Sequence, residues 1–354
     1  MKMTISMKQL TDWPMLALGA YLGLITISSL PANGQDRVYP KQGVPISGKL
    51  IEVSPDQIVL EVRGKNQTYP TAEVSKLVFD NEPTALDRAR ELISQQQYDQ
   101  ALEEIKKIES SGLKTSAVQE DFEFYRWYCE GQLGLSGAGD KAAAERGLKT
   151  LAGKNRNTHH FYPLCELLGQ LAMASSSPEA ARPFFALMEK SSSKEIQALA
   201  DWHMGELELA LANSAEARAR LQKVANANFN AANMNSIKNL SLVGLARCDC
   251  LEGKVSEALE QLNKLVRNND SADHELFARI NNAKGECYLK NNQTQNALIC
   301  YLQTDLLFFT DAQAHAEALY YLAQLWPKEG NGAKGVDARN RLKSSYASSV
   351  WANK

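Results

Sequence analysis

The chain has 354 residues, 44% of them apolar and 23% charged, which is the composition of an ordinary folded protein. Its formal net charge of −2 at pH 7 gives no sign of the basic surface that nucleic-acid binding requires, so nucleic acid is excluded as an expected partner. The same near-neutral charge also excludes, as an expectation, attachment to an anionic membrane surface through basic side chains.

The first 34 residues have the pattern of a secretory signal peptide. Lys2 and Lys8 precede an uncharged, apolar run at residues 15–30, and the small residues Ala32 and Gly34 follow it. We expect cleavage near Gly34, an exported protein that is periplasmic or extracellular, and no stable membrane insertion afterwards. The alternative is an uncleaved anchor, because the apolar run nearly reaches the roughly 20 residues that span a bilayer.

Residues 35–83 change to the period-two pattern of β-strands. Ile58, Leu60 and Val62 share one face of a predicted strand. Further strands are predicted over residues 46–53, 67–69 and 74–79. We therefore predict a small all-β module, a meander or SH3-like barrel, that has too little core to be stable alone and packs on the first helices. It either binds a partner through an edge strand or caps the helical stack.

Residues 84–347 have the pattern of seven pairs of amphipathic helices. In the clearest pair, Ala246 precedes Ala258 by twelve residues, with a turn at Gly253 between them. Helices whose axes lie about 8–10 Å apart need small side chains where they cross. The leading small residue recurs every 36 to 42 residues, a period typical of helical solenoids. The seven pairs are Ala89/Ala101, Gly131/Ala143, Gly169/Ala181, Gly205/Ala217, Ala246/Ala258, Gly285/Ala297 and Ala323/Ala338.

The helix pairs share short motifs around their small residues: Leu168-Gly169, Met204-Gly205, Lys284-Gly285-Glu286-Cys287-Tyr288, Tyr98-Asp99-Gln100-Ala101, Ser256-Glu257-Ala258 and Thr294-Gln295-Asn296-Ala297. On these motifs the chain resembles the tetratricopeptide repeat (TPR) family, in particular its exported bacterial members with a small N-terminal β module. The period exceeds the usual value of about 34, and a helix-breaking proline at the end of each unit is largely missing. A Sel1-like or other irregular αα-solenoid therefore stays open.

The resemblance implies a mainly α fold: an extended, curved solenoid of about seven TPR-like helix pairs over residues 84–347, followed by a C-terminal tail at 348–354. It also implies a concave groove, lined by the first helix of each pair, that binds a protein or peptide partner. The groove residues expected from this register are Tyr125, Tyr128, Gln132, Glu166, Gln170, Trp202, His203, Glu206, Arg247, Arg279, Asn282, Glu286, Tyr320, Tyr321 and Gln324. Because the set mixes acidic and basic side chains, it does not predict the charge of the ligand.

Signals of enzyme chemistry are sparse. No phosphate-binding glycine loop, dinucleotide fingerprint or nucleophile elbow occurs. His159 and His160 near Cys165 and Glu166 come nearest to a metal cluster, but zinc needs about four well-spaced ligands, so no metal and no cofactor is expected. The six cysteines fall in helical patterns, which favours buried thiols over one or two bridges between neighbouring helices.

The sequence therefore predicts an exported, non-catalytic scaffold that binds a protein or peptide partner in its groove. Two alternatives remain. One is an envelope structural protein that assembles with itself. The other is an enzyme accessory or carbohydrate-binding protein that acts through the β module.

Overall fold

The structure is a computed structural model that describes residues 35–175, 177–228, 233–347 and 349–354. The predicted signal peptide, residues 1–34, lies outside the described residues. In the part of the chain that is described, no helix is long and apolar enough to cross a membrane. Residues Gln35–Lys354 form one compact unit.

A five-stranded antiparallel sheet opens this unit. The strands are β1 (Asp36–Pro40), β2 (Ile46–Val53), β3 (Gln57–Val62), β4 (Lys65–Pro70) and β5 (Val74–Val78), in the spatial order β4-β3-β2-β1-β5. Ile58 and Leu60 are fully buried, as the period-two pattern predicted, but Val59 between them is buried as well and Val62 is only half-buried. The sequence analysis missed β1, because five residues that end at Pro40 show too little alternation to be recognised.

The sheet packs on the first helices, as its small core led us to expect. Val38, Leu60 and Leu77 belong to the same buried cluster as Leu86 and Ala89, which lie on the first helix of the solenoid. The β module and the first repeat therefore complete one core, and neither buries its apolar face alone.

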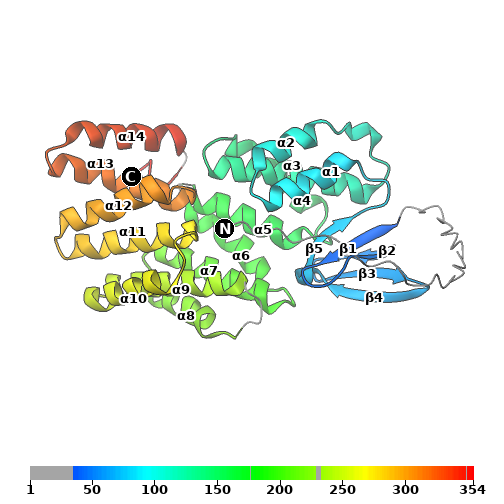
Figure 1. The fold of residues 1–354 in the computed structure, drawn as a ribbon, viewed down its shortest axis with the longest axis horizontal. Coiled ribbons are helices and arrows are strands. Elements are labelled where there is room, and N and C mark those ends of the chain that lie inside the picture. The colour runs from blue at the N-terminus through cyan, green and yellow to red at the C-terminus, as the bar shows by residue number, and fades with distance from the viewer. Residues whose placement is uncertain (1–34, 176, 229–232, 348) are drawn as a thin grey trace, which may run out of the picture. The chain divides into compact units, whose positions relative to one another are not determined.

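The rest of the described chain is helical and forms seven antiparallel pairs, which follow one another from cyan to red in Figure 1. The helices are α1 (Thr84–Ser94), α2 (Tyr98–Lys106), α3 (Ser116–Leu135), α4 (Lys141–Lys154), α5 (Phe161–Met173), α6 (Arg182–Met188), α7 (Lys194–Ala210), α8 (Ser214–Asn226), α9 (Asn233–Leu251), α10 (Val255–Asn268), α11 (His274–Lys290), α12 (Thr294–Leu307), α13 (Ala312–Lys328) and α14 (Gly332–Ser345). A 3₁₀ turn, Pro178–Ala181, precedes α6. The predicted solenoid of TPR-like helix pairs is confirmed.

The twelve-residue spacing marks the helix crossings, and the structure adds a third position sixteen residues after the leading small residue. The side chain at that position fills the space that a glycine leaves open. A Cβ atom at Gly169 would lie 2.1 Å from Cε1 of Phe185, which is itself fully buried. The same relation joins Gly205 to Leu221 and Gly285 to Tyr301. Small residues are therefore required here by close packing rather than by backbone conformation.

The solenoid curls back on itself, so the expected extended rod is wrong. A Cβ atom at Gly137, in the turn between α3 and α4, would lie 1.8 Å from the backbone oxygen of Ser345, the last residue of α14. Each pair is rotated from the one before it, and these rotations accumulate along the stack. Over seven pairs they bring the end of the last repeat against the second.

All six cysteine side chains are buried, as their helical pattern predicted. Burial raises the pKa of the Cys129 and Cys165 thiols to about 12, which keeps both protonated and unreactive at neutral pH.

Candidate functional site

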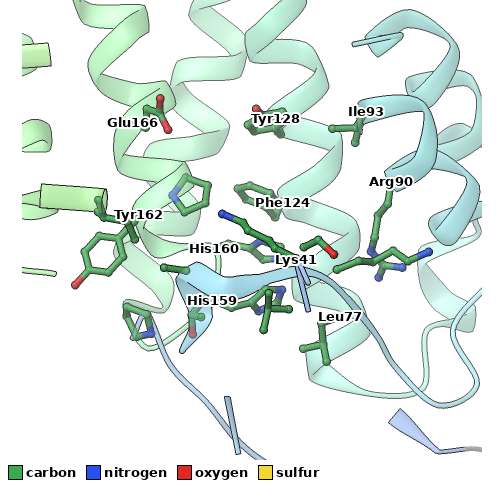
Figure 2. A pocket seen from close by; sticks show the side chains of 18 of the residues that line it. Lys41, Leu77, Arg90, Ile93, Phe124, Tyr128, His159, His160, Tyr162 and Glu166 are labelled. Atoms are coloured by element: carbon green, nitrogen blue, oxygen red, sulfur yellow. The ribbon is translucent and has the colours of Figure 1, made fainter. Parts of the chain in front are cut away.

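A cavity of about 610 Å³ lies between the sheet and the solenoid, where it is lined by residues of α1, α3, α5, α7 and α9 (Figure 2). The sheet side contributes Leu77 and Lys41, and the helical side contributes Phe124 and Tyr128 of α3 and Glu166 of α5. Figure 2 shows Lys41 extending toward α3 and α5, with Tyr128 and Glu166 on one side of it and His159 and His160 on the other. The cavity therefore combines aromatic and apolar walls with a few charged groups, as ligand sites usually do.

Three predicted groove residues meet at this cavity: Tyr125, Tyr128 and Glu166. Gln132 and Gln170 lie one helical turn farther along α3 and α5 and do not line it. The expected register thus brings side chains of α3 and α5 to this cavity.

The sheet is tied to the distant repeats by one carboxylate, Asp56, in the turn between β2 and β3. Its Oδ1 accepts hydrogen bonds from the backbone N–H of Ser192 at 2.9 Å, from the Ser192 hydroxyl at 2.8 Å and from the Ser191 hydroxyl at 3.2 Å. Burial alone raises the pKa of Asp56, but these bonds and the one from Tyr162 outweigh burial and leave the pKa below its ordinary value. We call this contact the Asp56 clasp.

Replacing Asp56 with alanine should lower the free energy of unfolding by about 1–2 kcal/mol, because the serine donors lose their acceptor. Since the folded pKa is depressed, the clasp is at full strength above the unfolded pKa of about 3.9, and it is lost as the pH falls through the lower folded value. The stability difference between wild type and Asp56→Ala, measured by urea unfolding, should therefore shrink below about pH 4. Asp337→Ala, an exposed change on α14, is the control and should stay within about 0.5 kcal/mol of wild type.

Beside the cavity, a buried charged cluster joins α1, α3 and the start of α5. The Arg90 guanidinium donates to both oxygens of Glu82, at 2.5 and 2.9 Å, and to Oδ2 of Asp121 at 2.5 Å. Oδ1 of Asp121 lies 2.6 Å from Nε2 of His160 and 3.3 Å from Nε2 of His159. The Asp121 side chain is 1% exposed, so this charge is held away from water by its partners alone.

The cluster lowers the pKa values of Asp121 and His160, but for different reasons. Burial raises the pKa of the Asp121 carboxyl, but His160 and Arg90 outweigh burial and hold that pKa well below its ordinary value. Burial, reinforced by the neighbouring His159, lowers the pKa of His160 to about 4, so the ring is neutral at pH 7. The His160 ring stacks on Phe124, with ring centres 3.7 Å apart and planes 12° apart, which fixes its orientation.

Sequence reasoning did not find Arg90, Glu82 or Asp121 as members of any site. Asp121 lies 31 residues from Arg90 and 39 from His160. The only signal in the sequence is an aspartate and an arginine at positions that face the interior of amphipathic helices, where a lone charge is not tolerated.

Farther along the solenoid, Arg247 of α9 bridges α11 and α13, the first helices of the next two pairs. Its Nε lies 3.2 Å from Glu286 of α11, and its Nη2 lies 2.9 Å from Glu317 of α13. Asn282 holds the second carboxylate in place, because its amide donates to Glu317 at 3.1 Å and to the backbone oxygen of Ala314 at 2.7 Å. Asn282 is 1% exposed, so this predicted groove residue is interior.

A second bridge connects α7 to α11 and α13. Nη1 of Arg279 lies 3.0 Å from Glu206, and its Nε lies 2.8 Å from Asp311. The guanidinium lies 5.4 Å from the ring centre of Trp202, a cation–π distance. Five predicted residues thus meet in these two ion-pair bridges: Glu206, Arg247, Arg279, Asn282 and Glu286.

Two more predicted residues are almost fully buried. Trp202 is 6% exposed and His203 is 5% exposed. The His203 ring stacks on Phe185, and its Nε2 lies 3.2 Å from Glu166. Both side chains pack between helices, which limits what a partner in the groove could reach.

The last repeat is covered by the C-terminal residues. Trp351 packs on Tyr320 and Tyr321, with ring centres 5.3 and 5.8 Å apart, and Nζ of Lys354 lies 3.7 Å from the centre of the Trp351 ring. Gln324 on α13 is exposed. The predicted tail therefore folds against the two tyrosines that were expected to face the groove.

No protein-family model and no curated protein matches this sequence. Similar solved structures include a tetratricopeptide repeat protein from Parabacteroides merdae, with 12% identity, 74% of this chain and 92% of that chain covered, and a TM-score of 0.49. The apo form of RapI has 14% identity, 75% and 78% coverage and a TM-score of 0.44. The TPR domain of P58(IPK) has 15% identity, 73% and 72% coverage and a TM-score of 0.27.

Matches this distant carry no argument about function, so the class of the protein rests on its own helix pairs. The contact of each helix with the next and the small residues at their crossings define a TPR-like αα-solenoid with an N-terminal β-sheet.

Proposed function

We propose that this protein is an exported, non-catalytic scaffold that binds a protein or peptide partner on the concave side of its solenoid. The observation that carries the proposal is the cavity between the sheet and the solenoid, whose volume of about 610 Å³ suits several side chains of a partner. Export is supported by the signal-peptide pattern at residues 1–34.

The chemistry of the cavity favours an apolar or aromatic anchor on the partner. Leu77, Phe124 and Tyr128, which Figure 2 labels, line the cavity together with Tyr125. Large aromatic side chains lose little entropy on binding and often dominate the affinity of an interface. Lys41 adds a positive charge and Glu166 a negative one. Two opposite charges can orient a partner without requiring that the partner carry a net charge.

The ion-pair bridges contribute less to this proposal. Arg247 and Arg279 already contact carboxylates of neighbouring helices, so a partner would have to replace those contacts rather than satisfy free groups. We therefore assign the main binding energy to the cavity and a positioning role to the bridges.

Replacing Tyr128 with alanine should weaken partner binding at least tenfold, about 1.4 kcal/mol, because an anchor in the cavity loses one aromatic wall. Cross-linking in the native cell with mass spectrometry identifies the partner, and calorimetry with the purified partner then measures the affinity. The matched control is Tyr288→Ala, which removes a partly buried tyrosine of α11 outside the cavity. Equal affinity of the two folded variants would contradict the proposal.

A further inference from the structure

We propose that Asp121, His159 and His160 bind one divalent transition-metal ion, with Zn²⁺ the ion that suits them best, at the edge of the cavity. Two imidazoles and one carboxylate are a common ligand set for zinc, whose fourth position then stays open. The sequence analysis expected no metal because it found no further ligand near the two histidines. The fold supplies that ligand from α3.

The distances suit a tetrahedral ion after a small movement. The three ligand atoms all lie within 4.8 Å of one another. Bonds of 2.0–2.1 Å place the ligand atoms of a tetrahedral site about 3.3 Å apart. The separation between His159 Nε2 and Asp121 Oδ1 is already 3.3 Å, whereas that between His160 Nε2 and the same oxygen is 2.6 Å. Of these two separations, only the second must lengthen, by about 0.7 Å.

The charges around the site leave room for a cation. Arg90 contacts Oδ2 of Asp121, so Oδ1 remains available on the side of the histidines. The positive charge of Arg90 is balanced by its two hydrogen bonds to Glu82. One negative charge, that of Asp121, is therefore left to meet the ion, and Arg90 holds the ligating carboxylate in place as outer partners of metal ligands do.

The site also has an open side. His159 and His160 both line the cavity, and the His159 side chain retains 14% of its exposure. His160 is fixed by its stacking on Phe124, and Asp121 by Arg90. The fourth ligand would come from the cavity: a water molecule, or a carboxylate or imidazole of a molecule bound there.

The test titrates the purified, full-length, chelator-treated protein with ZnCl₂ alone and measures binding by calorimetry. Co²⁺ serves as a spectroscopic probe of tetrahedral coordination. We expect one zinc ion per chain with a dissociation constant in the micromolar range or below, and a rise in Tm on binding. His159→Ala, the ligand substitution least harmful to folding, should weaken binding at least about tenfold.

His274→Ala provides the control, because His274 is exposed at the start of α11, away from the cluster, and should keep full affinity. Circular dichroism verifies that each variant is folded. A folded wild-type chain that takes up no zinc at about a hundredfold the expected dissociation constant overturns the proposal. Undiminished zinc affinity in folded His159→Ala overturns it as well, because the ion would then bind elsewhere.

Discussion

Replacing Gly169 with alanine is expected to lower the free energy of unfolding by about 2–3 kcal/mol, the upper range for overpacking a core. The new methyl group would lie 2.1 Å from Phe185 Cε1, and Phe185 is fully buried between α5 and α7 with no space to retreat. Urea unfolding followed by circular dichroism measures the loss. Within a helix, replacing glycine with alanine normally raises the stability by up to about 1 kcal/mol. A loss of stability at Gly169 would therefore be opposite to the usual effect.

Gly153 on α4 is the matched control, because a Cβ atom there has no neighbour within 4 Å. Gly153→Ala should keep or raise stability. In the double variant Gly169→Ala/Phe185→Leu, the smaller leucine makes room for the methyl group. The double variant should therefore lose less free energy of unfolding than the two single variants lose together. If the loss in the double variant equalled the sum of the two single losses, contact with Phe185 would not be the reason that residue 169 must be small.

Replacing Arg90 with methionine should cost about 3–5 kcal/mol, the largest effect we expect, because it leaves Glu82 and Asp121 as buried carboxylates without their cation. The Arg90 side chain is 3% exposed and the two carboxylates are 5% and 1% exposed, so water cannot replace the lost partner. Losing Arg90 removes a cause of the low pKa of Asp121, so the variant should recover part of its stability as the pH is lowered.

The control for this prediction is Arg88→Met, an exposed change on the same helix that should stay within about 0.5 kcal/mol of wild type. Thermal unfolding of both variants between pH 4 and pH 8 tests whether Arg90→Met shows a large, pH-dependent loss of stability while Arg88→Met stays near wild type. If Arg90→Met proved as stable as Arg88→Met, the cluster would not be the buried ionic centre that its distances describe.

The repeat pattern could be predicted because it is local in sequence. Ala246 and Ala258 lie on two helices joined by one tight turn, and the crossing distance of such helices restricts the side chains at both positions. Gly253 closes this turn at φ +85°, in the left-handed region that favours glycine. The helix pairs and the inward faces of their first helices therefore follow from short-range periodicity.

The candidate site could not be predicted in the same way. The Asp56 clasp joins residues 136 apart, and the ion pairs of Arg247 and Arg279 reach 70 and 73 residues along the chain. Whether such distant residues meet depends on the angle by which each repeat is rotated from the repeat before it. The sequence pattern does not encode this angle. For this reason the sequence placed Trp202 and Asn282 on the correct helices without showing that they are buried.

The sequence by itself thus determined the two architectural parts of this protein and the pairing of its helices, because these depend on side chains within one or two turns of each other. Only the tertiary structure decided that the solenoid curls back to bring Ser345 against Gly137, and that the sheet closes a cavity over α3. It also decided that His159 and His160 meet Asp121. Each of these contacts joins segments far apart in the chain, and their approach is set by the summed geometry of the packed repeats.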